Sequence, residues 1–145
     1  MDIEVKDAKF LFFDHDGTLV DTNRFYSSRK ISKDVLNPET VGIIAQTSCP
    51  YAIVAGTHKK SVERTISLLP RKPSFAVCLE DYYPKIKPDP APYLLALDRL
   101  KELGVGKNEV VVFEDSDEGS ESAKRAGFRV VRIKSYCNTG GMEQC

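Results

Sequence analysis

Two acidic residues that could do chemistry, Asp14 and Asp16, stand one residue apart directly after the apolar run Phe10–Phe13. Gly17 and Thr18 follow them. Burying an unpaired carboxylate is costly, so a pair at the end of a buried strand needs a bound cation, a proton or fixed hydrogen-bond donors. The stretch therefore predicts a partner for these carboxylates, either a bound ion or groups from elsewhere in the chain.

The elements that must position this pair are indicated by five short runs of apolar, β-forming residues. The runs are nearly continuous, which is typical of strands covered on both faces. Strands that alternate with helices form parallel sheets with right-handed crossovers. We therefore expect an α/β fold, a three-layer sandwich with a five-stranded parallel, Rossmann-like sheet. The expected strands are Lys9–Phe13, Tyr51–Ala55, Phe75–Leu79, Val110–Phe113 and Arg129–Ile133, and the helices between the later strands are Thr57–Leu69, Ala91–Leu103 and Asp117–Ala126.

Polar residues follow four of these runs directly. The carboxyl ends of parallel strands meet at one edge of a sheet, where α/β proteins bind their ligands, so these residues should lie close together. If the first and fourth strands are neighbours, Asp14 and Asp16 face the acidic pair that follows the fourth strand. The four segments are Asp14–Gly17, Gly56–His58, Glu80–Asp81 and Glu114–Ser116.

The predicted cluster of carboxylates offers the oxygen ligands that Mg²⁺ prefers in proteins. Lys87, which opens the helix containing Ala91–Leu103, can reach the same edge and contact a phosphate oxygen there. Thr57, at the start of another helix, offers a hydroxyl and backbone N–H groups to the same anion. A carboxylate nucleophile, a metal, a lysine and a hydroxyl are the parts required for phosphoryl transfer through an aspartyl-phosphate.

At these residues the chain resembles the haloacid dehalogenase-like (HAD-like) hydrolase superfamily, in a form typical of its phosphatases. The segment Asp14–Asp21, DHDGTLVD, resembles the first motif of that family, and Lys87–Tyr93, KPDPAPY, resembles the third. The segment Val111–Gly119, VVFEDSDEG, with the trailing SAKRAG of Ser122–Gly127, resembles the fourth. The resemblance therefore covers most of the chain.

The resemblance implies a role for each of these residues. Asp14 would be the nucleophile, Asp16 the general acid and then the base, and Lys87 the bridge between Asp14 and the phosphate. Mg²⁺ would be held by the carboxylates of Asp14 and Asp115 and by the backbone carbonyl of Asp16, with Glu114 binding through water. His15, between the two aspartates, is a candidate contact for the substrate, although a histidine there can instead orient its loop.

The chain departs from the family pattern at the second motif. The family has Ser or Thr at the end of the second strand, whereas the aligned residue here is Gly56. Thr57 stands one residue later and could supply the hydroxyl in its place. Gly56 and Thr57 are therefore both candidates for binding the phosphate, and loss of one hydrogen bond to a charged acceptor costs about 1–3 kcal/mol.

A second departure is the size of the cap, a domain that many relatives insert after the first motif. Residues 22–50 leave room for two modest helical segments, expected at Thr22–Lys33 and Glu39–Thr47, and for little or no cap domain. We therefore expect a core domain over residues 1–134, with reduced cap-region helices at 22–50. The remaining residues, 135–145, are expected to form a flexible C-terminal tail.

An open site changes the expected substrate. Family members without a cap accept macromolecular phosphoesters or cover the site with a neighbouring subunit, so the substrate could be a small molecule or a macromolecule. A homo-oligomer could also cover the site. Aromatic side chains could form a rim around it, and the candidates are Phe25, Tyr26, Tyr82 and Tyr83.

The composition argues against other classes of partner. Lys plus Arg and Asp plus Glu both total 21, so the formal net charge is zero and no overall field attracts nucleic acid or an anionic membrane. No apolar run approaches the ~20 residues needed to span a bilayer, and the N-terminus lacks the pattern of a signal peptide, so a cytoplasmic location is expected. Cys137 and Cys145 could pair, but reduced thiols are the expectation in that compartment.

The leading hypothesis is thus a Mg²⁺-dependent phosphohydrolase that cleaves a phosphomonoester through an aspartyl-phosphate. The alternative is a catalytically weak or inactive HAD-like protein that binds phosphate and serves regulation, which Gly56 and the missing cap favour. A phospho-acceptor signalling receiver is a third class, but its acceptor normally follows the third strand, where this chain has Glu80–Asp81.

Overall fold

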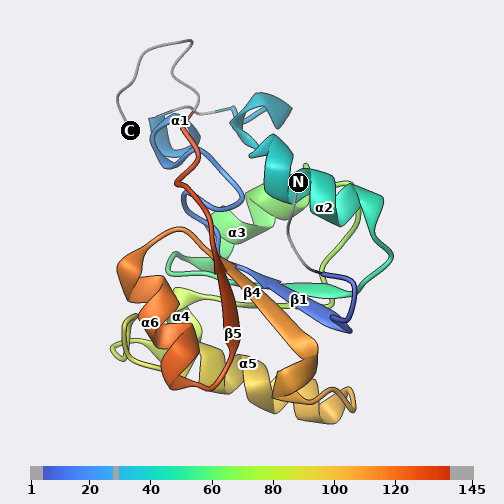
Figure 1. The fold of residues 1–145 in the computed structure, drawn as a ribbon. Coiled ribbons are helices and arrows are strands. Elements are labelled where there is room, and N and C mark those ends of the chain that lie inside the picture. The colour runs from blue at the N-terminus through green and yellow to red at the C-terminus, as the bar shows by residue number, and fades with distance from the viewer. Residues whose placement is uncertain (1–4, 28–29, 138–145) are drawn as a thin grey trace.

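A five-stranded parallel sheet forms the centre of the computed structural model, which describes residues 5–27 and 30–137 (Figure 1). The strand order is β3-β2-β1-β4-β5, so the order reverses between β1 and β4. This arrangement confirms the expected α/β sheet and places its switch point at the end of β1. The strands are β1 (Phe10–Phe13), β2 (Tyr51–Val54), β3 (Phe75–Val77), β4 (Val110–Glu114) and β5 (Arg129–Arg132).

Helices cover both faces of the sheet and complete the three layers (Figure 1). On one face lie α1 (Thr22–Ser27), α2 (Pro38–Gln46) and α3 (Lys59–Ile66). The other face carries α4 (Leu79–Tyr82), α5 (Ala91–Glu102) and α6 (Asp117–Arg125). Two short 3-10 turns, Lys33–Val35 and Lys107–Glu109, complete the described elements.

The core is divided by the sheet into two apolar clusters. Successive side chains of a strand point to opposite faces, so Leu11 and Phe13 belong to one cluster and Phe10 and Phe12 to the other. All four residues of β1 are buried, which explains why the central strands are apolar without alternation. Each large apolar side chain that is fully buried contributes about 1.5–3 kcal/mol, so the sheet is a rigid support for its loops.

The structure corrects the third expected strand, Phe75–Leu79. The strand ends at Val77, and a short helix, α4, begins at Leu79. The helix forms because the Asp81 carboxylate accepts a hydrogen bond of 2.7 Å from the backbone N–H of Cys78, which stabilises a helix N-terminus. Glu80 similarly accepts from the backbone N–H of Lys59 at 2.9 Å, at the start of α3. These two acids therefore stabilise helix starts and do not join the cluster at the sheet edge.

The region expected to replace a cap contains two helices, as the sequence indicates, and forms no separate domain in its described residues. The first helix is shorter than expected and ends at Ser27, whereas residues 28–29 lie outside the described part. Asn37 begins α2 by accepting from the backbone N–H of Glu39 at 3.1 Å. Asn37 and Thr40 both donate to the carbonyl oxygen of Thr18, at 3.0 and 2.7 Å, so α2 fixes the loop after β1.

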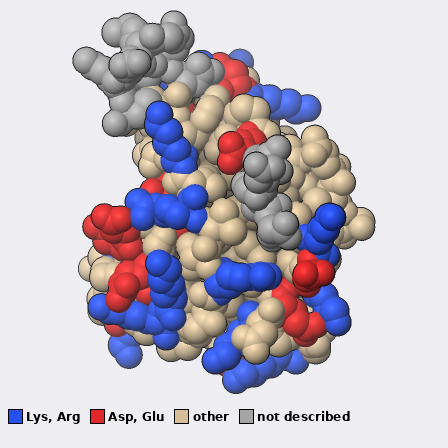
Figure 2. All heavy atoms as spheres, viewed as in Figure 1, with Lys and Arg blue, Asp and Glu red and all other residues tan. Residues whose placement is uncertain are grey.

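The edge strand β5 carries exposed basic residues at both ends, Arg129 and Arg132. Arg132 forms an ion pair of 2.8 Å with Asp117 of the neighbouring α6. Figure 2 shows this face, where basic and acidic side chains lie close together. Charges on an edge strand discourage pairing with another chain. Within the described residues, no helix is long and apolar enough to cross a membrane.

Candidate active site

The carboxylates from the two central strands lie side by side. Phe13 pairs with Phe113 in the parallel register of β1 and β4, so the residues that follow, Asp14 and Glu114, emerge next to each other. The backbone N–H of Asp14 donates to the carbonyl of Phe113 at 3.1 Å. Asp14, Glu114 and Asp115 each offer one oxygen within 4.8 Å of the others. The predicted convergence of these acids is confirmed.

Lys87 is the cation of this cluster. Its Nζ lies 2.9 Å from Asp14 Oδ1 and 2.6 Å from Glu114 Oε2, and it also donates to the carbonyl of Val54 at 3.0 Å. Burial lowers the pKa of the ammonium group, but the charges of Asp14 and Glu114 raise it above its ordinary value, so Lys87 stays charged. Lys87 lies in the loop before α5, which begins four residues later, so the expectation that it opens the helix is wrong.

Glu114 is fully buried, yet only part of its carboxylate is compensated. Oε2 accepts from Lys87 and from the phenol of Tyr93, whereas Oε1 has no hydrogen-bond partner among the described residues. Burial and the charge of Asp14 raise the pKa of Glu114 to about 7. The same two causes raise the pKa of Asp115 to about 6. Both raised pKa values mean that the positive charge near these acids does not compensate their negative charges.

The donor set fits a small, hard cation. The Lys87 ammonium group contacts two of the three carboxylates, those of Asp14 and Glu114, and the buried oxygen Glu114 Oε1 is unpartnered among the described residues. Unpaired buried carboxylate oxygens are costly, and a bound cation removes that cost. Carboxylate oxygens without histidine or cysteine are the donors typical of Mg²⁺, Mn²⁺ or Ca²⁺ sites. The cluster is therefore a candidate cation site.

Two glycines give the acids the space they occupy. Gly17 has a φ of +75°, and a Cβ built there would lie 2.0 Å from Asp115 Oδ2. A Cβ at Gly119 of α6 would lie 1.9 Å from Glu114 Oε1. Since real Cβ atoms never approach an oxygen so closely, any side chain at either position would displace a carboxylate of the cluster.

Three residues of the site were not predicted from the sequence. The buried hydroxyl of Thr18 lies 3.3 Å from Asp14 Oδ2 and 3.2 Å from Asp115 Oδ1, so it can donate to either. The Tyr93 phenol donates to Glu114, and the Ser135 hydroxyl donates to Asp115 Oδ2 at 2.5 Å. Thr18 and Tyr93 belong to the first and third motifs, which is the signal that could have found them.

Asp16 lies further out than Asp14, with 36% of its side chain exposed. His15 does not face the solvent between the two acids, because its ring is fully buried. Its Nδ1 contacts Asp16 Oδ1 at 2.9 Å and its Nε2 contacts Thr65 Oγ1 at 2.6 Å. The buried ring has no free surface for a substrate, so the geometry gives His15 the alternative role of orienting its loop.

The end of β2 presents a glycine and a hydroxyl. Gly56 is exposed, and a Cβ built there meets nothing within 4 Å. Thr57 is 9% exposed, and its Oγ1 lies 2.8 Å from the phenol oxygen of Tyr26. Of the four aromatic rim candidates, Tyr26 and Tyr83 are exposed, whereas Phe25 and Tyr82 are buried in the core and cannot form a rim.

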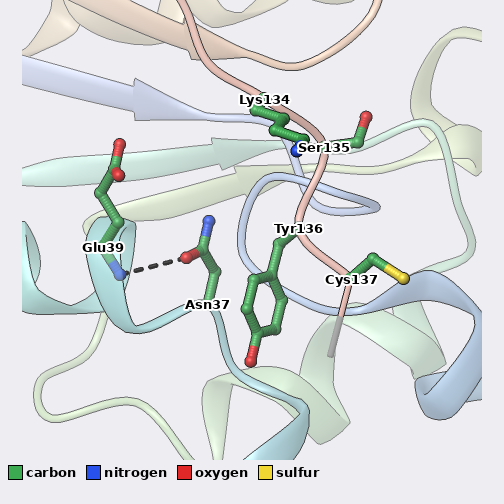
Figure 3. A pocket seen from close by; sticks show the side chains of 6 residues that line it. All are labelled: Asn37, Glu39, Lys134, Ser135, Tyr136 and Cys137. Carbon is green, nitrogen blue, oxygen red and sulfur yellow. Dashed lines mark hydrogen bonds between the residues drawn. The ribbon is translucent and has the colours of Figure 1, made fainter. Parts of the chain in front are cut away.

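Residues 134–137 lie beside the loop after β1, although the whole segment 135–145 was expected to be flexible. The backbone N–H of Tyr136 donates to the carbonyl of Gly17 at 2.7 Å. Cys137 is disulfide-bonded, contrary to the expected reduced state, and residues 138–145 lie outside the described part. A cavity of about 250 Å³ separates this segment from the start of α2 (Figure 3) and is lined by Asn37, Glu39, Lys134, Ser135, Tyr136 and Cys137.

Comparison with known proteins identifies the family. The sequence model of the family described as haloacid dehalogenase-like hydrolase matches residues 38–133, which is more than half of the chain. The chain belongs to this family. The match begins after the first motif, so it does not include Asp14 or Asp16.

Curated HAD-like relatives match shorter stretches. A CBBY-like protein of Arabidopsis thaliana is 37% identical over 87 residues, which are 58% of this chain and 26% of the relative. A phosphorylated carbohydrates phosphatase of Thermotoga maritima is 49% identical over 55 residues, which are 37% of this chain and 24% of the relative. The chain thus spans about a quarter of the length of these relatives.

A solved structure shares the fold over nearly the whole chain. CbbY from Rhodobacter sphaeroides, in complex with phosphate, superposes with a TM-score of 0.69. The alignment covers 94% of this chain and 92% of that chain at 18% identity. The HAD-like fold with a five-stranded parallel sheet and little cap is therefore established, whereas the substrate is a separate question.

Proposed function

We propose that this protein is a Mg²⁺-dependent phosphohydrolase that cleaves a phosphomonoester through an aspartyl-phosphate on Asp14. One observation carries the proposal: the Asp14 carboxylate is held between Lys87 Nζ at 2.9 Å and the Thr18 hydroxyl at 3.3 Å, beside a partly uncompensated pair of acids. A carboxylate that is fixed and faces added positive charge is suited to attack phosphorus.

The reaction uses two residues of the first motif. A carboxylate oxygen of Asp14 forms a bond to phosphorus while the bond from phosphorus to the substrate oxygen breaks, and Asp16 gives its proton to that leaving oxygen. Asp16, now a carboxylate, takes a proton from a water molecule whose oxygen attacks the phosphorus of the aspartyl-phosphate. Inorganic phosphate leaves, and Asp14 is regenerated as a carboxylate.

The other site residues hold the phosphoryl group and its counter-ion. The Asp14 and Asp115 carboxylates and the backbone carbonyl of Asp16 would bind Mg²⁺, with Glu114 binding through water. When bound, the ion supplies positive charge that stabilises the oxygens of the transferred phosphoryl group. Lys87 adds a positively charged donor beside Asp14. Its contacts with Asp14 and Glu114 already hold it in place, so it need not move when charge develops on the phosphoryl group.

The comparisons support this proposal at the level of reaction class. The relative from Thermotoga maritima is named a phosphatase of phosphorylated carbohydrates, and CbbY from Rhodobacter sphaeroides binds phosphate. We propose a phosphorylated substrate for this chain as well. The small cap region gives such a substrate little enclosure, so a macromolecular phosphoester or a second subunit over the site fits the described part as well as a free small molecule does.

A second candidate function is phosphate binding without efficient turnover. The exposed Gly56 favours it, since this position supplies no hydroxyl to the phosphate. Under this hypothesis the chain binds Mg²⁺ and phosphate analogues in a regulatory role.

The test is hydrolysis of p-nitrophenyl phosphate by the purified chain with and without Mg²⁺. We expect multiple turnovers that require Mg²⁺ and fall at least about 1,000-fold in Asp14→Asn, because that variant has no nucleophile. The matched control is Asp98→Asn, which removes an exposed carboxylate of α5 and should leave turnover unchanged. Binding of phosphate without turnover would reject the phosphatase and favour the second candidate.

A further inference from the structure

The first helix after the site loop brings an unassigned phenol to the outer carboxyl group. Tyr26, on α1, places its hydroxyl oxygen 3.1 Å from Asp16 Oδ1 and 2.8 Å from Thr57 Oγ1. Asp16 follows β1 and Thr57 follows β2, so one side chain joins the two strand ends at which the first and second motifs lie. Tyr26 is 46% exposed, whereas a tyrosine that only packs into the core would be buried.

The ring of Tyr26 is anchored by its neighbours. It packs edge-on against Phe25 with ring centroids 4.9 Å apart and an interplanar angle of 79°. Phe25 is fully buried, contacts the His15 ring at 5.1 Å, and lies under the guanidinium group of Arg64 at 4.9 Å. Since the helix is fixed by Phe25, the Tyr26 hydroxyl has a defined position over the site.

Asp16 Oδ1 has two partners in this arrangement. The buried His15 ring contacts it at 2.9 Å, and the exposed phenol of Tyr26 contacts the same oxygen at 3.1 Å. Without the phenol, His15 would be left as the side-chain partner of this partly exposed carboxyl group among the described residues. A partly exposed side chain that loses a partner regains rotamer freedom.

We propose that Tyr26 is a positioning residue for proton transfer by Asp16, an inference that rests on the proposed phosphatase function. The phenol is within hydrogen-bond distance of both the Asp16 carboxyl group and the Thr57 hydroxyl, so it holds the carboxyl group where a leaving oxygen must receive its proton. A general acid acts only within hydrogen-bond reach of the atom that it protonates, and small displacements reduce the rate strongly. The short cap region thus contributes to the chemistry through one side chain of α1.

A leaving-group comparison separates this role from a general structural role. Phenyl phosphate leaves as a basic phenolate, which needs protonation, whereas p-nitrophenyl phosphate leaves as a stabilised anion that needs little. In Tyr26→Phe, which keeps the ring packing, we expect kcat/KM for phenyl phosphate to fall about 10–100-fold and kcat/KM for p-nitrophenyl phosphate to fall less than about 3-fold. The ratio kcat/KM reports the steps up to formation of the aspartyl-phosphate, before Asp16 acts as the base. Loss of structure or of metal would lower both values equally.

Two further variants complete the experiment. Asp16→Asn should show the same selective loss of kcat/KM at larger size, because it removes the proton donor itself, and its kcat should fall for both substrates, because it also removes the base of the second step. Tyr51→Phe removes a phenol hydroxyl that donates to the carbonyl of Arg71 at the opposite end of β2, and both rates should stay unchanged. An equal loss of kcat/KM for both substrates in Tyr26→Phe, or no loss of kcat/KM, overturns the inference. If the unaltered chain hydrolyses neither substrate, the proposed function itself fails, and the inference fails with it.

Discussion

The site has two halves whose acids are held in different ways. The inner half contains Asp14, Glu114 and Lys87, which lie at the ends of adjacent strands or in a loop against them and are joined by buried ion pairs. The outer half contains Asp16 and Tyr26, which are partly exposed and joined by a hydrogen bond of 3.1 Å. The sheet fixes the inner half, whereas a six-residue helix and one loop fix the outer half.

This difference predicts which substitutions should destabilise the folded protein and which should only slow the reaction. Charges in the inner half are desolvated, so removing one partner leaves the others uncompensated. Groups in the outer half lie near water, so their loss changes the position of a proton donor more than the free energy of unfolding. The predictions that follow test this contrast in order of decreasing effect.

Removal of the inner ammonium group should cause the largest change. In Lys87→Met, the buried Asp14 and Glu114 face each other without a cation, so the free energy of unfolding should fall by about 3–5 kcal/mol in metal-free buffer. Mg²⁺ should restore part of this loss, because the ion supplies the missing charge. Urea unfolding with EDTA or Mg²⁺ measures both effects.

The control for this variant is Lys101→Met, which removes an exposed ammonium group 3.9 Å from Asp98 on α5. The free energy of unfolding should change by less than about 0.5 kcal/mol there. If Lys87→Met were as stable as this control, the inner half would not depend on charge compensation, and the contrast between the halves would disappear.

A methyl group beside Glu114 should weaken the candidate cation site. In Gly119→Ala the new Cβ would lie 1.9 Å from Glu114 Oε1, so the carboxylate must move. We expect Mg²⁺ affinity to fall about 10–100-fold, the range typical when supporting groups of a metal site are disturbed. Isothermal titration calorimetry with Mg²⁺ measures the change.

Gly42→Ala is the matched control, since Gly42 also lies within a helix and a Cβ there meets nothing within 4 Å. Alanine should leave Mg²⁺ affinity unchanged there and stabilise α2 by about 0.5–1 kcal/mol. Equal Mg²⁺ affinities in the two alanine variants would show that Glu114 takes no part in binding the ion.

The stability of the metal-free protein should fall as pH rises through the titration range of Glu114 and of its neighbour Asp115. The pKa values of Asp115 and Glu114 are raised from 3.8 and 4.5 to about 6 and about 7, so the folded state binds protons that the unfolded state has lost. Their contribution is present below about pH 4 and is lost as pH rises through 6 and 7. Asp34 and Glu80, which are exposed, and Glu109, which is partly exposed, have lowered pKa values and act in the opposite sense, but water screens them.

Urea unfolding in EDTA at pH 5 and pH 8 measures this dependence, with a loss on the order of 2 kcal/mol expected at the higher pH. With Mg²⁺ present, the free energy of unfolding should instead rise with pH, because the ion binds the deprotonated carboxylates and these become more abundant as pH rises. The variant Glu114→Gln should flatten the profile in EDTA. If the free energy of unfolding in EDTA rose toward pH 8, it would contradict the raised pKa values of Glu114 and Asp115.

The inner half could be predicted from the sequence because local patterns determine it. An apolar run followed by acids, repeated at Asp14 and Glu114, places both groups at one sheet edge once the strands are parallel neighbours. Lys87 was found through the third motif, although its loop was mistaken for a helix start. The short helix α4 was missed because the apolar Cys78 and Leu79 continue the strand pattern. The hydrogen bond from the Cys78 backbone N–H to the Asp81 carboxylate starts a helix there instead.

The outer half was predicted less well because its contacts join residues that no periodicity relates. The residue types around Asp16 give no sign that His15 is buried against Thr65, or that Tyr26 meets Thr57. Neighbouring aromatic residues likewise divide between core and surface, as Phe25 and Tyr26 do on α1. Such assignments depend on the packing of helices against the sheet, which single-sequence patterns do not specify.

The smallest predicted effect concerns Gly56, which follows β2 and precedes the Thr57 that Tyr26 contacts. In Gly56→Ser the new side chain has free space, since a Cβ there meets nothing within 4 Å, and its hydroxyl would stand at the position that the resemblance aligns with the family's Ser or Thr. We expect kcat for p-nitrophenyl phosphate to rise about 10-fold, because a hydrogen bond to a charged phosphoryl oxygen contributes about 1–3 kcal/mol. The control Gly56→Ala adds the Cβ without the hydroxyl and should leave kcat unchanged. If serine gave no gain over alanine, this position would not need a hydroxyl, which is the result expected if Thr57 already supplies the hydrogen bond.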